Sequence, residues 1–187
     1  FFTCQSTDGG GIAASIIGLY VLWGLWRADG LPEHARAGRS TLLASLLVFG
    51  VGGIIGYLIE GSNVTIPAHY HGSIVGVTLA FMGLTYHLLP KLGYLPVRQR
   101  LAVWQSRIYA GGQLMHVIGL AWSGGYGVQR KTAGAAQGLD SLERVVSMGF
   151  MGAGGFIAII GGVLFLVVVF MSILGARKAS ESSLEAV

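Results

Sequence analysis

Charged side chains are scarce in this sequence of 187 residues, in which Asp, Glu, Lys and Arg together make up 11%. A soluble domain carries about 25% charged residues. Cysteine is scarcer still, because Cys4 is the only one and no disulfide can form within the chain. Hydrophobic residues reach 53%, and the mean hydropathy is +0.67. This composition excludes an ordinary soluble domain and a disulfide-stapled one, and it predicts a membrane protein.

Long apolar runs recur along the chain, and five of them approach or exceed the roughly 20 residues that a helix needs to cross a membrane. We therefore predict an all-α, polytopic membrane bundle of about five transmembrane helices. We expect an irregular lead-in at 1–10, a transmembrane domain at 11–175 and a polar cytoplasmic tail at 176–187. The five runs are Gly11–Trp26, Thr41–Ile59, Pro67–Leu89, Leu101–Gly124 and Val145–Gly175.

Basic residues set the expected orientation of these helices. If successive helices alternate in direction, eight of the twelve lysines and arginines lie on the side that carries the C-terminus. Three more share one loop on the other side, and Arg107 lies inside the fourth run, where it can snorkel to the interface. By the positive-inside rule, the C-terminus is cytoplasmic and the N-terminus lies outside.

Two histidines, His69 and His71, stand at the front of the third apolar run. A helix turns about 100° per residue, so their side chains point about 200° apart. They cannot hold one metal ion together, but each can reach a different ligand on its own side of the helix. Imidazole suits iron, and a histidine within a membrane span is a functional candidate. The spacing favours one helix between two haems; the alternative is a pair of interfacial histidines that hydrogen-bond to neighbours.

Two further histidines are weaker candidates. His87 shares the face of His69 but lies some 27 Å along the same helix, too far to share a metal ion. His116, in the fourth run, is expected about 8 Å deeper than His71. A shared iron is possible with tilt, but a packed, hydrogen-bonded histidine is the favoured interpretation of His116.

Glycines and two cations accompany the histidines. Gly52 and Gly56 in the second run form a small-residue pair that lets a helix or a flat ligand come close, and Gly72 and Gly76 repeat the spacing in the third run. Arg130 and Lys131 are adjacent in the loop that is expected on the same side as His69 and His71. Cations of this kind bind carboxylates such as haem propionates, although a solvated charge pair is the alternative.

Several segments together resemble the catalytic subunit of haem–copper oxygen reductases, in the style of the shorter B-type oxidases. The resemblance covers about residues 41–175, which correspond to that family's last five helices. It implies that His69 binds a high-spin haem, that His71 binds a low-spin haem, and that Arg130 and Lys131 hold propionates. Here Gln129-Arg130-Lys131 replaces the family's usual Pro-Arg-Arg. The matching segments are Asn63–His71, Leu84–Pro90, Gly119–Trp122 and Val128–Thr132.

The same resemblance implies what this chain needs from elsewhere. The family's copper-B histidines, their linked tyrosine and the other low-spin axial histidine belong to earlier helices, and nothing in this sequence replaces them. The chain is therefore expected to be a fragment or a split half, inactive alone. Its expected partners are a segment carrying the N-terminal helices and an electron-donor subunit with copper or cytochrome. The expected cofactors are two haems of type a or b, in a bacterial or archaeal plasma membrane.

Three functions remain open at this point. The first is the haem-binding C-terminal part of a terminal oxidase. The second is a di-haem membrane cytochrome, or a nitric oxide reductase-like subunit, without oxygen reduction. The third is a structural membrane subunit that has lost its haems.

Overall fold

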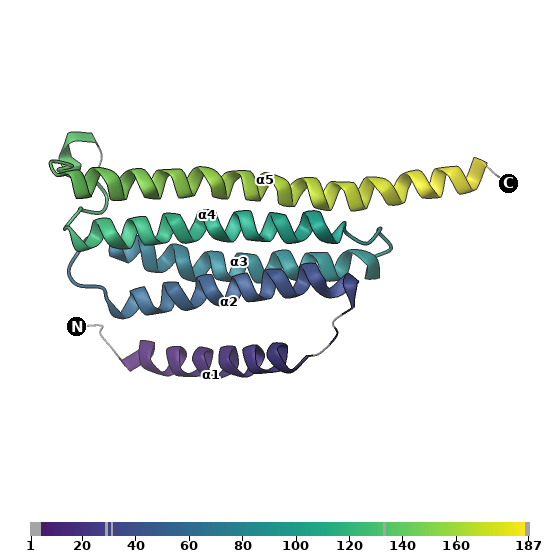
Figure 1. The fold of residues 1–187 in the computed structure, drawn as a ribbon, viewed down its shortest axis with the longest axis horizontal. Coiled ribbons are helices and arrows are strands. Elements are labelled where there is room, and N and C mark those ends of the chain that lie inside the picture. The colour runs from purple at the N-terminus through teal and green to yellow at the C-terminus, as the bar shows by residue number, and fades with distance from the viewer. Residues whose placement is uncertain (1–4, 29, 31, 133, 186–187) are drawn as a thin grey trace. The chain divides into compact units, whose positions relative to one another are not determined.

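The structure is a computed structural model that describes residues 5–28, 30, 32–132 and 134–185. Within these residues, five α-helices and two short 3-10 helices make up the fold (Figure 1). The prediction of an all-helical chain with about five helices is confirmed. The elements are α1 (Gln5–Arg27), η1 (Glu33–Ala35), α2 (Arg36–Tyr57), α3 (Thr65–Lys91), α4 (Gln99–Gly125), η2 (Gly134–Gln137) and α5 (Leu142–Glu185).

The chain divides into two compact units, Phe1–Pro32 and Glu33–Val187. Gly30, with a φ of 66°, and Pro32 interrupt the helical path between them. Helix α1 begins at Gln5, within the lead-in that was expected to be irregular. Extending a helix costs less than nucleating one, so the apolar run carries the helix back through its glycines. Near its other end, Arg27 lies 4.6 Å from the ring centroid of Trp23.

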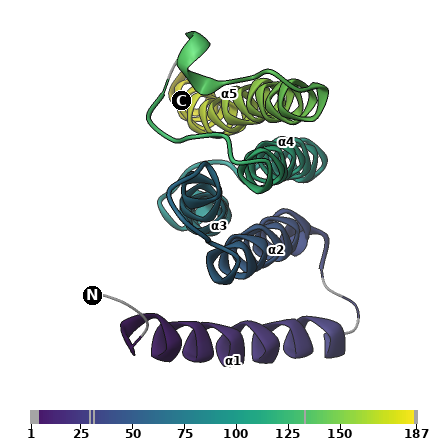
Figure 2. The same cartoon turned by 90° about the vertical axis from the view of Figure 1, so that its left-hand side faces the viewer.

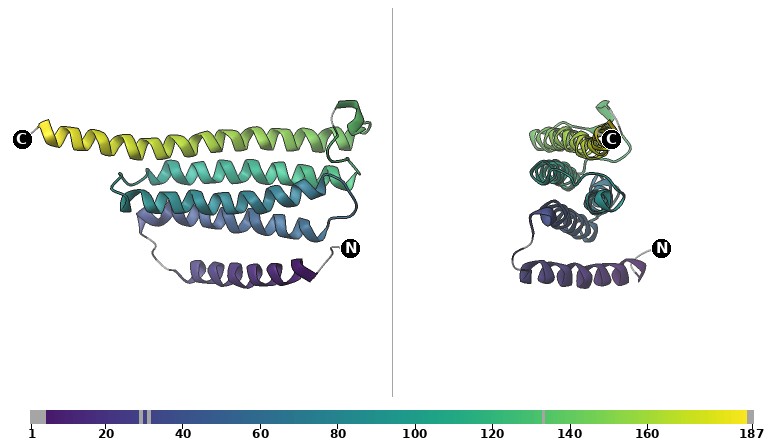
Figure 3. Two further views of the ribbon diagram at one scale, coloured as in Figure 1. Left: turned by 180° about the vertical axis from the view of Figure 1, so that it is seen from behind. Right: turned by 90° about the vertical axis from the view of Figure 1, so that its right-hand side faces the viewer.

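The second unit is an antiparallel bundle of α2, α3, α4 and α5. Helices α2 and α3 pair along their lengths, α5 packs on α4, and α4 also contacts both α2 and α3. Figure 2 shows this arrangement end-on. Seen from behind in Figure 3, α5 extends past the other helices of the bundle. The polar residues after Gly175 continue α5 as a helix as far as Glu185.

Glycines determine how closely neighbouring helices approach. A Cβ added to Gly52 on α2 would lie 2.7 Å from the carbonyl carbon of Gly72 on α3, so these two backbones touch. A Cβ at Gly119 on α4 would lie 2.6 Å from the backbone nitrogen of Met151 on α5. Close backbone approach is what favours association of helices in membranes. The predicted packing role of Gly52 and Gly72 is confirmed.

Helix α4 buries polar side chains that form hydrogen bonds to its neighbours. Gln105 is fully buried, accepts a hydrogen bond from the Tyr86 hydroxyl at 2.8 Å and donates one to the Gly161 carbonyl at 3.1 Å. Nearer the other end of α4, the buried Ser123 hydroxyl donates to that of Ser147 on α5 at 2.7 Å. These hydrogen bonds join α4 to α3 and α5 and satisfy groups that could not face lipid.

Among the described residues, three helices are long and apolar enough to cross a membrane. They span Glu33–Tyr57, Thr65–Lys91 and Leu142–Arg177. Helix α4 has the same length as α3, 27 residues, but its polar and charged residues, Arg100 and Arg107 among them, lower its hydropathy. The apolar stretch Gly11–Arg27 of α1 is shorter than these spans. The composition and these helices are those of a membrane protein.

Candidate functional site

Two loops meet at one end of the bundle, beside the start of α3. The backbone nitrogen of Val64 donates to the carbonyl of Val128 at 3.0 Å, and Asn63 and Gln129 form an isolated antiparallel bridge. Val64 and Val128 are both buried. The prediction that 60–66 and 125–144 lie on one side of the bundle is therefore confirmed, and this end carries His69, His71, Arg130 and Lys131.

His69 points from α3 towards α2. Its Nδ1 donates a hydrogen bond to the carbonyl of Gly52 at 2.8 Å, and its ring lies against Gly56. A Cβ at Gly56 would be 2.7 Å from Nδ1, so only glycine leaves the imidazole its present place. The ring is half-buried between the two helices.

His71 lies on another side of α3 and faces α4 instead. Its Nδ1 donates to the carbonyl of Pro67 at 2.9 Å, and its side chain is exposed. Its ring centroid is 4.9 Å from that of His116 on α4, with the planes tilted by 46°. The prediction that His69 and His71 serve different sides of the helix is confirmed. The expected depth of His116 was wrong, because that residue lies beside His71.

The three histidines share one feature of hydrogen bonding. His116 Nδ1 donates to the carbonyl of Met151 on α5 at 3.1 Å, as His69 and His71 do to other carbonyls. A carbonyl oxygen has no proton, so Nδ1 must carry the hydrogen in each case. In a neutral imidazole this leaves the lone pair on Nε2. Metal-binding histidines are oriented in this way, with one ring nitrogen held by a backbone carbonyl and the other free for the metal.

The two predicted propionate ligands behave differently. Arg130 is half-buried, and its Nε donates to the Ser62 hydroxyl at 3.1 Å across the two loops. Lys131 is exposed and has a φ of 61°, which is uncommon for a residue with a Cβ. Both residues lie at the histidine end. Arg130 is thus positioned by its contact with the neighbouring loop.

Arg144, at the start of α5, holds this end together in a way that was not predicted from the sequence. Its Nε donates to the Tyr126 carbonyl at 3.0 Å, and one terminal nitrogen donates to the Gly138 carbonyl at 2.7 Å and to Asp140 at 2.6 Å. The sequence did hold a signal for Arg144, because the positive-inside rule disfavours a third cation in the loop that already carries Arg130 and Lys131. Its role depends on carbonyls of the folded loop, which no sequence motif marks.

The remaining candidates do not join the site. His87 is exposed towards the far end of α3, as its spacing predicts. Within the described part of the chain, no three His, Cys, Asp or Glu side chains gather as a metal ion held by protein alone would require. The chemistry available here is therefore that of single imidazoles, each able to act as one axial ligand.

Comparisons with known proteins find relatives of undescribed function. No protein-family model matches the chain. An uncharacterized protein of Rickettsia prowazekii (strain Madrid E) is 40% identical over 139 residues, which cover 68% of this chain and 27% of that protein. An uncharacterized protein of Aquifex aeolicus (strain VF5) is 37% identical over 57 residues, 30% of this chain and 15% of that protein. The chain thus spans about a quarter of the first relative's length and less of the second's.

Proposed function

We propose that this chain is the haem-binding C-terminal part, or split half, of a terminal oxidase catalytic subunit of the haem–copper type. In this proposal the five helices cross the plasma membrane of a bacterium or archaeon, with the C-terminus cytoplasmic. His69 provides the axial ligand of a high-spin haem, and His71 provides one axial ligand of a low-spin haem. One observation carries the proposal: two imidazoles leave opposite sides of one helix, and each is held at Nδ1 with Nε2 free.

The surroundings of the two histidines fit the group that the proposal assigns to each. Gly56 leaves room for the His69 ring against α2, and the carbonyl of Gly52 accepts its hydrogen bond. The exposed His71 ring needs a partner for Nε2, because a polar nitrogen facing hydrocarbon is costly. If bound, each haem would supply an iron that carries electrons, and the haem held by His69 would also be able to bind a gas. This chain's own contribution is to fix both imidazoles rigidly on α3, one helix width apart.

Arg130 is the proposed propionate ligand at the same end, with Lys131 assisting. A guanidinium binds a carboxylate through two parallel hydrogen bonds. Because Nε of Arg130 is bonded to Ser62, its terminal nitrogens remain available for a carboxylate. A copper site and the second axial ligand of the low-spin haem belong to a partner that carries the N-terminal helices. A copper- or cytochrome-containing subunit would deliver the electrons.

Single-histidine variants test the proposal. In the protein purified from its native membrane, His69→Ala should remove the carbon-monoxide-reactive high-spin signal and keep the low-spin band, whereas His71→Ala should do the reverse. His87→Ala is the matched control, because it removes an exposed histidine from the same helix and should keep both signals. Loss of one and the same band in both variants would exclude two separate irons.

A second candidate function is a di-haem cytochrome, or a nitric oxide reductase-like subunit, without oxygen reduction. The observation that favours it is the ring of His116 beside that of His71. With metal–nitrogen bonds of about 2 Å, imidazoles on opposite sides of one iron have centroids about 6 Å apart. The 4.9 Å found here would have to widen by more than about 1 Å to admit iron. A low-spin band that vanishes in His116→Ala as well as in His71→Ala would favour this candidate.

A further inference from the structure

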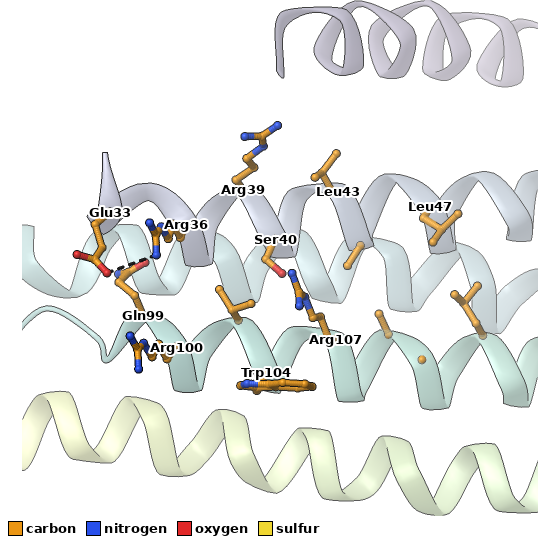
Figure 4. Close-up of a pocket in the computed structure, with 15 residues that line it drawn as sticks. Glu33, Arg36, Arg39, Ser40, Leu43, Leu47, Gln99, Arg100, Trp104 and Arg107 are labelled. Atoms are coloured by element: carbon orange, nitrogen blue, oxygen red, sulfur yellow. Dashed lines mark hydrogen bonds and ion pairs between the residues drawn. The ribbon is translucent and has the colours of Figure 1, made fainter. Parts of the chain in front are cut away.

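A groove of about 780 Å³ lies between α2 and α4, towards the end of the bundle opposite the histidines (Figure 4). Four arginines and one glutamate line its outer part, and leucines, valine, alanines and glycine line its inner part. The outer residues are Arg36, Arg39, Arg100, Arg107 and Glu33, and the inner ones include Leu43, Leu47, Val103 and Leu114.

The positive charge of the four arginines at the mouth of this groove exceeds the single negative charge of Glu33. Glu33 forms an ion pair with Arg36 at 3.4 Å, and both side chains are largely exposed. No carboxylate of the described residues lies within salt-bridge distance of Arg100 or Arg107. In Figure 4, Arg107 reaches from α4 towards Ser40 on α2, across the groove. The mouth therefore presents guanidinium groups that suit an anion with several oxygens, such as a phosphate.

The groove has the length of one membrane leaflet. Arg107 is eight residues after Gln99, about 12 Å along α4, and Leu114 is about 22 Å along it. One leaflet of a bilayer is about 20–22 Å thick when its headgroup region is included. The apolar side chains of its inner part suit a lipid acyl chain.

We propose that the groove binds an anionic phospholipid from the arginine-rich side of the membrane. Arg100 and Arg107 hold the phosphate, and one acyl chain lies over the apolar inner part. Basic pockets between membrane helices bind anionic headgroups in this way. The proposal uses no residue of the histidine end, so it stands or falls independently of the haem proposal.

Trp104 provides a local reporter, because it lines the groove and is 61% exposed. The protein would be purified, placed in nanodiscs and titrated with brominated phosphatidylglycerol or brominated phosphatidylcholine, whose bromines quench a tryptophan that they touch. Subtracting the signal of Trp104→Phe isolates this tryptophan from the others. We expect half-quenching at a several-fold lower mole fraction of phosphatidylglycerol than of phosphatidylcholine. Extraction and mass spectrometry of the wild-type protein give an independent count of retained phosphatidylglycerol.

Arginine variants identify the cause of that preference. Arg107→Gln should weaken phosphatidylglycerol binding about fivefold, the effect of about 1 kcal/mol per arginine near a membrane surface. Arg107→Lys should keep most of it. Arg98→Gln is the matched control, since it removes an exposed cation at the same end, outside the groove, and should change nothing. Equal quenching by both lipids, equal weakening by Arg98→Gln, or a polypeptide that shields Trp104 from both lipids would overturn the proposal.

Discussion

His69 can take its position because Gly56 has no side chain. The ring of His69 fills the place where a Cβ would stand, and this lets Nδ1 reach the carbonyl of Gly52 one turn earlier on α2. The position of the imidazole is thus set from outside its own helix. Gly53, on the same helix, has no atom within 4 Å of its added Cβ and offers a comparison within the same turn.

Gly56→Ala is expected to displace His69 and break its hydrogen bond to Gly52. Overpacking of this kind typically costs about 1–3 kcal/mol. Gly53→Ala should be neutral or stabilise the helix by up to about 1 kcal/mol, because alanine favours helix more than glycine does. Thermal unfolding in detergent measures both effects. Equal stability of the two variants would show that His69 has room to move aside.

Arg130→Gln is expected to lower a haem midpoint potential, because removing a cation near a propionate favours the oxidised iron. The loss of a hydrogen bond to a charged group typically costs about 1.5–3 kcal/mol. Redox titration of the purified protein measures the shift. Ser62→Ala is the control, since it removes the 3.1 Å contact of Arg130 and keeps the charge. If both variants behave alike, Arg130 only braces the two loops.

His116 shows where residue counting fails. Counting from the ends of the apolar runs places it about 8 Å deeper than His71. In the structure α3 begins at Thr65 and α4 ends at Gly125, which reduces the axial offset to about 4.5 Å. Imidazole side chains can span the rest. The helical repeat alone was enough to predict that His69 and His71 lie on different sides of α3. The residues that each ring contacts could not be predicted, because they depend on how the neighbouring helices pack against α3.

At the scale of elements, α4 is the helix on which the bundle is assembled. It contacts α2, α3 and α5, and its polar side chains find their partners on other helices. The apolar runs predicted where α2, α3, α4 and α5 lie, since the length of an apolar run is visible in the sequence. They did not predict why α4 is more polar, because Gln105 finds its partners 19 residues before it and 56 residues after it.

A double-mutant cycle tests the link between α3 and α4. Gln105→Leu leaves the Tyr86 hydroxyl without its acceptor, and a buried group without a partner typically costs about 1–3 kcal/mol. Tyr86→Phe in the same chain removes that hydroxyl. The double variant should therefore cost less than the sum, with a coupling of about 0.6–1.7 kcal/mol, as in other membrane helices. Additive unfolding free energies would mean that the 2.8 Å hydrogen bond contributes nothing.

At the scale of the whole molecule, large apolar side chains remain exposed on α2, α3 and α5. They include Leu47, Ile54, Ile74, Phe81, Phe156 and Ile159. Lipid covers such residues in a membrane protein, and further helices of a partner would cover them equally well. Lipid is a poor neighbour for the exposed His71 ring, since its Nε2 needs a polar partner or a metal.

The 187 residues expressed alone are expected to bind fewer than two haems and to consume no oxygen. The described residues offer no grouped set of ligands for copper and only a crowded second histidine for the low-spin iron. Haem stoichiometry by pyridine haemochrome and an oxygen electrode measure the two quantities in mild detergent. Two bound haems with turnover would contradict the split-subunit proposal and direct attention to His116.

The hydrogen bonds of Arg144 have a mechanical consequence. Helix α5 rests mainly on α4, so a pulling force applied at its C-terminal end would peel it away without loading α2. The peeling would meet its last resistance where Ser147 bonds Ser123 and where Arg144 grips Tyr126, Gly138 and Asp140. In a single molecule stretched in this direction, the loop that carries Arg130 would therefore unfold only after the rest of α5 had been pulled off the bundle.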